Sequence, residues 1–212
     1  MTDKPSLKDF YRSPKIYIEL PSGGKFYDED IIEWPENNEL PVYAMTPKDD
    51  MIVRNPDALL NGDAVIQLVK SCVPSIKKPE EIIAPDMELI LVAIRAASEK
   101  DRTVTIDQNC PKCEHENSFS LDLSVAVQDF ESIADLSEFT LSNGLTIGVK
   151  PANYIYSIQT AKSMIEQANI LGRLQSGEFD DENNRIKAIG SAFNQLAQFN
   201  YGVLVNSVKY IK

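Results

Sequence analysis

The pattern of apolar and polar residues in the first fifty positions predicts short strands in a compact body. Residues 15–20 alternate between the two types, which is typical of a strand, and the glycine-containing segment 21–24 predicts a turn. Residues 25–34 remain extended and are expected to form a return strand, with a further short strand at 42–45. Residues 1–14, which contain two prolines and few apolar residues, are expected to be a flexible arm.

Three helices are expected to follow. Thr46 is a suitable cap, Pro47 suits the first helical position, and Asp49 is the acidic residue three positions after the cap. This first helix should end before Pro56, and a second should occupy residues 62–73. A third is expected over residues 85–98; its apolar residues lie on more than one face, which predicts a buried helix.

The middle of the chain predicts two β-hairpins. Residues 103–107 and 118–123 alternate, and they enclose the segment Cys-Pro-Lys-Cys, so the cysteine pair is expected at the tip of a hairpin. Residues 138–141 and 145–149 are expected to form the second hairpin. Between them lies Ser-Asn-Gly, and Asn-Gly is a strong hairpin-turn signal.

The last third is expected to be a pair of helices over residues 153–176 and 180–211, separated at Gly177. Residues of the second helix recur at alternating steps of three and four, a spacing that predicts the seam of a coiled-coil-like pair. The seam residues are Ile186, Ile189, Phe193, Leu196, Asn200, Val203, Ser207 and Tyr210. The matching stripe on the first helix consists of Ile158, Ala161, Ile165 and Ala168.

The predicted fold is therefore α+β. A mixed β/α body should span residues 15–150, including the cysteine hairpin at 103–123, and an antiparallel helical hairpin should span residues 151–212. Two interpretations of this helical hairpin remain open: it packs on the body in the ordinary way, or it leaves an apolar strip for a partner helix. The candidate partner-binding residues, which lie outside the main seam, are Tyr154, Tyr156, Phe199 and Leu204.

Charge narrows the classes of partner. The 212-residue chain has a formal net charge of −11. Binding to nucleic acid relies on neutralising phosphates with basic side chains, and anionic membranes attract the same basic groups, so both targets are disfavoured. Residues 1–150 contain 15 basic and 27 acidic residues, a net charge of −12, whereas residues 151–212 contain 6 basic and 5 acidic residues, a net charge of +1. The near-neutral helical tail is thus the expected partner-binding surface.

Signals for export and catalysis are scarce. The chain opens without an apolar stretch behind basic residues, and no apolar run approaches the roughly 18 residues needed for a membrane span, so a soluble, intracellular protein is expected. His115 is the only histidine, which leaves little material for a Ser-His or Cys-His relay, and no phosphate-binding glycine loop is present. The sequence therefore favours a non-enzymatic binding or assembly protein.

One segment carries candidate metal chemistry. Cys110 and Cys113 are two residues apart at a hairpin tip and can direct two thiolates at one zinc ion, which requires four ligands. His115 is a candidate third ligand and Cys72 a candidate fourth, or a second copy of the chain supplies a second cysteine pair. Two alternatives remain: reduced cysteines without metal, and a redox pair. A redox pair normally lies at the N-terminus of a helix, whereas this pair lies between two expected strands.

The order of several short motifs then suggests a family. They are Leu-Pro-Ser-Gly-Gly-Lys-Phe-Tyr at 20–27, Met-Thr-Pro-Lys-Asp-Asp at 45–50, Asn-Pro-Asp-Ala-Leu-Leu-Asn-Gly at 55–62, Val-Lys-Ser-Cys-Val at 69–73, the segment 86–95 and the cysteine pair. Over about residues 15–125 the chain resembles the baseplate hub assembly proteins of T4-like contractile-tail bacteriophages. The resemblance implies a non-enzymatic factor that helps to build the central hub in the host cytoplasm. It also implies a role related to that of tail-assembly chaperones, with hub proteins and the tape-measure protein as partners, and a place in the virion tail baseplate.

Two other functions stay open beside this one. A zinc-ribbon-like regulatory or nucleic-acid adaptor would need bound zinc and a basic face, yet Asp107, Glu114, Glu116 and Asp122 flank the cysteine pair. A thiol redox protein would use Cys110 and Cys113 directly. The expected cofactor set is accordingly either empty or a single zinc ion, and self-association of the chain is left open.

Overall fold

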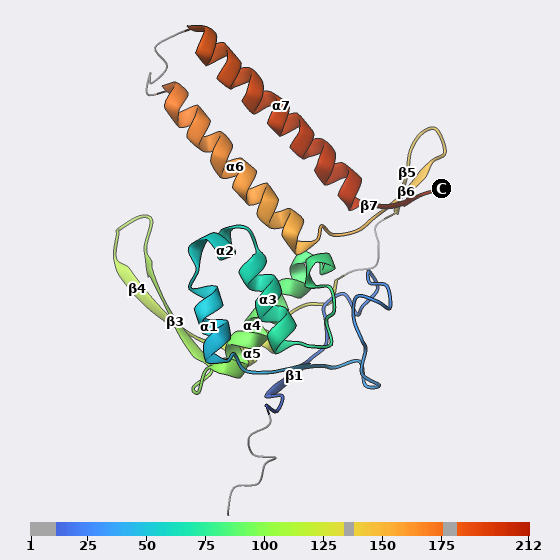
Figure 1. The fold of residues 1–212 in the computed structure, drawn as a ribbon, viewed down its shortest axis with the longest axis vertical. Helices are drawn as coiled ribbons and strands as arrows, with labels where there is room; N and C mark the ends of the chain where they lie inside the picture. The colour runs from blue at the N-terminus through green and yellow to red at the C-terminus, as the bar shows by residue number, and fades with distance from the viewer. Residues whose placement is uncertain (1–11, 134–137, 176–181) are drawn as a thin grey trace, which may run out of the picture.

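A computed structural model describes residues 12–133, 138–175 and 182–212, and it has a mixed α+β architecture (Figure 1). Most of the predicted arm and the predicted break at Gly177 lie outside the described residues. The body contains β1 (Ile16–Ile18), β2 (Leu40–Val42), α1 (Pro47–Val53), α2 (Pro56–Leu60), α3 (Asp63–Cys72), η2 (Pro79–Glu81) and α4 (Ala84–Ser98). The remaining elements are β3 (Thr103–Asn109), β4 (Glu116–Asp122), α5 (Leu123–Gln128), β5 (Glu138–Thr140), β6 (Thr146–Val149), α6 (Tyr154–Gln175), α7 (Glu182–Ser207) and β7 (Val208–Ile211).

The first sheet differs from the predicted one. β1 pairs antiparallel with β2, Ile16 opposite Val42, and not with residues 25–34. Those residues form turns, apart from a single bridge between Ile32 and Ile76, so the predicted return strand is wrong. Gly24 explains the difference: its φ is +80°, and a Cβ there would lie 2.6 Å from the Trp34 ring. The chain therefore folds back on itself, with the indole covering the glycine.

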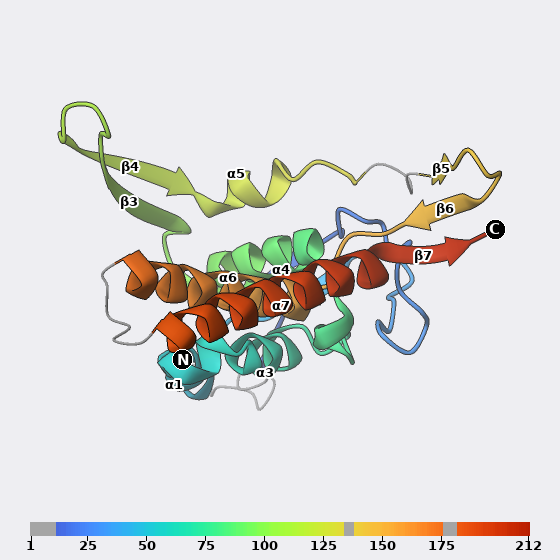
Figure 2. The ribbon, with the colours of Figure 1, turned by 90° about the horizontal axis from the view of Figure 1, so that it is seen from above.

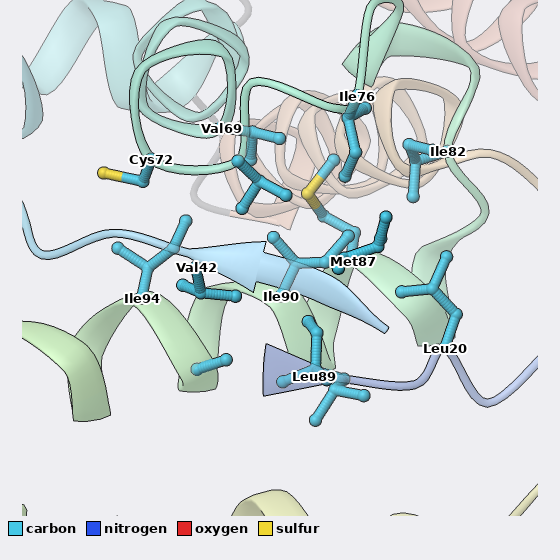
Figure 3. Close-up of a cluster of buried hydrophobic side chains, with 14 of the residues drawn as sticks. Leu20, Val42, Val69, Cys72, Ile76, Ile82, Met87, Leu89, Ile90 and Ile94 are labelled. Carbon is cyan, nitrogen blue, oxygen red and sulfur yellow. The ribbon is translucent and has the colours of Figure 1, made fainter. Parts of the chain in front are cut away.

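The helices of the body surround a core centred on α4. The predicted start of α1 is confirmed, because the Thr46 side chain accepts from the Asp49 backbone N–H and the Asp49 carboxylate accepts from the Thr46 N–H at 2.7 Å. The short helices α2 and η2 were not predicted; Asn55 caps α2. As expected, α4 is buried, and Figure 3 shows its side chains beside Val42 of β2 and Val69 of α3. Ile18 of β1 belongs to the same core. Fully buried members of this core include Leu40, Val42, Val69, Met87, Ile90 and Ile94.

Two motifs that carry the family resemblance meet inside this core. The Asp86 carboxylate on α4 is fully buried and accepts hydrogen bonds from the Ser22 backbone N–H at 2.9 Å, the Ser22 hydroxyl, and the Tyr27 hydroxyl at 2.5 Å. The Tyr27 oxygen in turn accepts from the Ile83 N–H at 3.2 Å. Burial raises the pKa of Asp86, and these three donors partly oppose that rise. The Ser-Gly-Gly loop is thus fastened to the start of α4.

A second polar anchor joins the N-terminal end of the described chain to the body. The Arg12 guanidinium donates to the Ala44 carbonyl at 3.0 Å and to the Ser71 carbonyl at 2.6 Å. It lies 5.5 Å from the centroid of the Tyr43 ring and 3.7 Å from the buried Asp49 carboxylate. Arg12 therefore connects β2, α1 and the end of α3, although it falls within the range predicted to be a flexible arm.

Two β-structures project from opposite sides of the body, as Figures 1 and 2 both show. β3 and β4 form the predicted cysteine hairpin, with Thr103 opposite Asp122. It leads into α5, a helix that was not predicted and that Asp122 caps by accepting from the Ser124 N–H at 2.8 Å. On the other side, β5 and β6 form the predicted second hairpin, with Gly144 at φ +88° in its turn.

The C-terminal segment is not helical to its end. Residues 208–211 form β7, which pairs antiparallel with β6 to give the order β5-β6-β7, so the predicted helix over these residues is wrong. Gly148 makes this pairing possible, since a Cβ there would lie 2.5 Å from the Tyr210 ring that covers it. The helical hairpin α6–α7 thus returns to the sheet that precedes it. No helix in the described part of the chain combines the length and the apolar character that crossing a membrane requires.

Candidate partner-binding surface

The cysteine hairpin ends in a tight loop that places two thiols side by side. The Cys110 N–H donates to the His115 carbonyl and the Glu114 N–H donates to the Cys110 carbonyl, both at 2.8 Å. Backbone N–H groups of Lys112 and Cys113, and then the Cys113 side chain, bond to the Cys110 sulfur and lower its pKa. Cys113 is exposed and both cysteines are free. The loop is therefore shaped to stabilise a thiolate at Cys110.

The other two predicted ligands do not join this pair. Cys72 is buried in the main core on α3, where burial raises the pKa of its thiol, and its sulfur lies 3.2 Å from the Arg12 guanidinium (Figure 3). His115 contributes its backbone carbonyl to the loop. Within the described residues, no three His, Cys, Asp or Glu side chains gather closely enough to hold a metal ion. One chain alone therefore presents two thiols of a possible zinc site, and its zinc content remains a prediction.

The helical hairpin rises from the body as an antiparallel pair (Figure 1). Its base is fixed by backbone bonds from Tyr154 N–H to the Ile82 carbonyl at 2.8 Å and from Ala84 N–H to the Ala152 carbonyl at 3.0 Å. At Gly62 a Cβ would lie 3.0 Å and 3.1 Å from the side chains of Ile155 and Ile158, so the first turns of α6 pack closely on the start of α3. The Tyr154 side chain packs against the core.

An aromatic contact joins α6 to α7. The rings of Tyr156 and Phe199 are stacked, with centroids 6.3 Å apart and an interplanar angle of 10°. The Tyr156 hydroxyl donates to the Phe199 carbonyl at 3.2 Å and lies over Gly202, where a Cβ would be only 2.5 Å from that oxygen. Three of the four candidate partner-binding residues, Tyr154, Tyr156 and Phe199, are thus engaged within the chain.

The face of α7 that packs against α6 is turned away from part of the predicted seam. Ile189, Val203 and Ser207 of the seam are half-buried. Phe193 and Asn200, which were also expected to face α6, are exposed, whereas Ala192, Phe199 and Gly202 are half-buried. The reason is local packing: Tyr156 fits against α7 only where Gly202 leaves room, and this contact rotates the helix about its axis. On α6, Ile158 is half-buried while Ala161, Ile165 and Ala168 are exposed, so the matching stripe does not face α7 as a whole.

The rotation leaves an apolar face on α7, here called the outer stripe. It is defined by Ile186, Phe193, Tyr201, Leu204 and Val205, all of them exposed. Ile186, Phe193 and Leu204 lie within about 20° of one another around the helix axis, because their separations are close to multiples of 3.6 residues. Phe193 is 68% and Tyr201 71% exposed, on the side away from Phe199. From residue 188 to residue 207 the sequence contains no charged residue.

Such a surface is unusual for a water-exposed helix. Charged residues normally occupy the solvent face of a helix, and clustered exposed apolar side chains mark interaction sites. Of the four candidate residues, Leu204 belongs to the outer stripe. The sequence reasoning missed Tyr201 and Val205, although the uncharged run from residue 188 to residue 207 would have pointed to them.

Comparison with protein families identifies the family of the chain. The chain matches a family described as "T4 bacteriophage base plate protein" over residues 13–190. The chain belongs to this family. The matched range extends past the motifs that suggested the resemblance and includes all of α6 and the first part of α7. No match is found among curated proteins, and none among solved structures.

Membership in this baseplate family indicates a structural or assembly role in the phage tail, with other phage proteins as partners. The structure shows what the motifs behind the resemblance do in the fold. The Ser-Gly-Gly loop, the start of α1 and the start of α4 supply Ser22, Asp49 and Asp86, whose hydrogen bonds hold the body together. These buried polar groups are structural, and the exposed apolar side chains of this baseplate protein described above lie on α7.

Proposed function

We propose that this chain is a non-enzymatic assembly factor of the phage baseplate, which binds helical segments of hub proteins or of the tape-measure protein through the outer stripe of α7. It would do so in the host cytoplasm, before the tail is complete. The single observation that carries the proposal is the outer stripe: large apolar side chains exposed on a helix that has no charge over twenty positions.

The energetics favour a partner on this surface. Burying a large apolar side chain contributes about 1.5–3 kcal/mol, so covering Phe193, Tyr201 and Leu204 together would drive association strongly. The seven-residue step from Ile186 to Phe193 suits an amphipathic helix that presents its own apolar residues every three or four positions. A helical partner therefore fits this face better than a loop or a charged surface.

The acidic body is expected to contribute less to partner selectivity than the outer stripe of α7 does. Carboxylates of residues 1–150 would repel other acidic proteins and copies of this chain at long range, which favours solubility. The near-neutral α6–α7 hairpin lacks that field, and it projects beyond the body (Figure 1). The α6–α7 hairpin is thus the part of the molecule where charge repulsion opposes contact with a partner helix least.

Co-expression tests the proposal. The tagged full-length chain would be produced with each hub protein and with the tape-measure protein of the same phage, and co-purified complexes would be quantified. Truncation at Lys150 would also remove β7, which pairs with β6, so point variants are cleaner. Phe193→Asp should abolish co-purification of the partner, and Gln195→Asp, an exposed position turned about 160° away around α7, should not. Equal recovery of every partner with both variants would overturn the proposal.

A further inference from the structure

The β3–β4 ribbon has an apolar face that the described residues leave largely exposed. In the strand register Val104 lies opposite Leu121 and Ile106 opposite Phe119, so these four side chains share one face. Phe119 is 57% exposed, and Ile106 and Leu121 are exposed as well. Two-stranded ribbons are marginally stable alone in water, so this face calls for a covering surface.

The same face leads to the cysteine pair. Side chains alternate along a strand, so residues 104, 106, 108 and 110 lie on one side of β3 and its extension, opposite residues 121, 119, 117 and 115. Cys110 is thus on the same side of the ribbon as Ile106 and Phe119, and the uncharged pair Gln108 and Asn117 lies between them. That face holds no Asp, Glu, Lys or Arg.

The acidic residues of the two paired strands lie on the other face of the ribbon, and Glu114 lies in the loop at its tip. Asp107, Glu116 and Asp122 alternate with the apolar positions and therefore point the opposite way. Repulsion between like charges weakens with distance and with salt, so carboxylates on the outer faces oppose the meeting of two copies less than carboxylates between them would. Two apolar faces from two copies can accordingly meet without placing these carboxylates in contact.

The cysteine pair is a half-site that one chain does not complete. Zinc in structural sites takes four ligands in a tetrahedron, with thiolates at about 2.3 Å. The loop supplies two thiols, and among the described residues no third His, Cys, Asp or Glu joins them.

We propose that two copies of this chain join through their β3–β4 ribbons, apolar face to apolar face with the tips together, and bind one zinc ion by Cys110 and Cys113 of both copies. This arrangement has two-fold symmetry, in which the same patch meets itself. It covers the exposed face and supplies the two missing ligands in a single interface. Binding converts four thiols to thiolates and releases four protons, with no change in oxidation state. The inference does not rest on the proposed function, because it uses the ribbon and not α7.

Metal titration of the full-length chain tests this inference. The protein would be purified with a non-coordinating reductant, stripped of metal with a chelator, dialysed, and titrated with Zn²⁺ and separately with Co²⁺. Sedimentation equilibrium would give the mass of the species formed. We expect binding to saturate at about one metal for every two chains, the mass to double with metal, and Co²⁺ to show the thiolate-to-metal charge-transfer absorption of a four-thiolate tetrahedral site.

Variants distinguish a zinc site shared by two copies from a site within one chain. Cys113→Ser should abolish both metal binding and the metal-dependent dimer. His115→Ala should leave the stoichiometry unchanged, whereas a site within one chain that used His115 would lose affinity. Phe119→Thr should weaken the dimer at least tenfold, and Ser120→Thr, on the opposite face of the ribbon, should not. Each substituted side chain at 113, 119 and 120 is exposed, so the variants are expected to fold.

Three results would overturn the proposal: no metal bound by the reduced chain, one metal per chain in a monomer, or a dimer that forms equally without metal and with Cys113→Ser. None of these results would affect binding of a partner helix to the outer stripe, so failure of this inference and failure of the proposed function are distinguishable.

Discussion

The Asp86 carboxylate on α4 accepts the Ser22 backbone N–H at 2.9 Å, and this bond ties two segments 64 residues apart into one buried polar cluster. Both residues are almost fully buried, Asp86 at 0% and Ser22 at 1% exposure. A carboxylate at this depth is tolerated only because its donors replace water. The hydrogen bond between Ser22 and Asp86 therefore gives the Ser-Gly-Gly loop a structural role.

Asp86→Ala should lower the free energy of unfolding by about 1–3 kcal/mol or more, because it strands the buried Ser22 and Tyr27 donors without an acceptor. Urea unfolding followed by circular dichroism measures the change. Glu88→Ala, an exposed position two residues further along α4, is the matched control and should change stability by less than about 0.5 kcal/mol. Equal stability of the two variants would show that the buried cluster contributes little.

Asp49 should make stability depend on pH on the acid side. Burial alone would raise its pKa, but hydrogen bonds from Thr46 and Ser71 and the nearby Arg12 charge outweigh this and hold the pKa below the ordinary 3.8. A lowered folded-state pKa means that the stabilisation is fully present above pH 3.8 and is lost as pH falls through the lowered value.

Unfolding free energies of the wild type and Asp49→Asn, measured from pH 6 to pH 2, test this prediction. The difference between the two should shrink as the pH falls below about 4, since only the wild type loses a charged, hydrogen-bonded carboxylate there. Asp63→Asn, an exposed acidic position at the start of α3, serves as a control for the substitution itself. A constant difference across the range would mean that Asp49 acts by packing and not by charge.

Gly148 should be intolerant of a side chain. A Cβ at this position would lie 2.5 Å from the Tyr210 ring, so Gly148→Ala is expected to displace Tyr210 and loosen β7 from β6. Hydrogen exchange of the Lys212 amide, which donates to the Thr146 carbonyl at 2.8 Å, reports this loosening directly.

Gly190→Ala is the matched comparison, because a Cβ there meets nothing within 4 Å on the exposed face of α7. It should stabilise the protein by about 0.5–1 kcal/mol through helix propensity and leave exchange of the Lys212 amide unchanged. If the Lys212 amide of Gly148→Ala exchanged at the wild-type rate, then the contact between Tyr210 and Gly148 would not be needed to hold β7 against β6.

Short-range signals predicted much of this fold. Thr46, Pro47 and Asp49 marked the start of α1, and Asn143-Gly144 marked the β5–β6 turn, because in each case the deciding contacts lie within a few residues. Apolar residues on more than one face of α4 correctly predicted that this helix is buried. The cysteine pair was also placed correctly at a hairpin tip.

Long-range contacts decided the features that sequence reasoning missed. Residues 208–211 continue the helical spacing of α7, but pairing with β6 and the fit of Tyr210 over Gly148 make them a strand. Likewise, the phase of α7 depends on Tyr156 lying against Gly202, 46 residues further along the chain, and no periodicity within α7 contains that information. The location of the outer stripe follows from this contact. Of the four candidate partner-binding residues only Leu204 lies on the stripe, and partner binding by the helical tail stays a prediction.

The most direct measurement of the central claim is complementation of a phage whose own copy of this gene is disabled. Host cells would supply the wild type, Phe193→Asp or Gln195→Asp at matched soluble levels, and completed baseplates and tails would be counted by electron microscopy. We predict that the wild type and Gln195→Asp restore baseplates while Phe193→Asp does not, because Phe193 lies on the outer stripe and Gln195 does not. Restoration by Phe193→Asp to the wild-type level would contradict it.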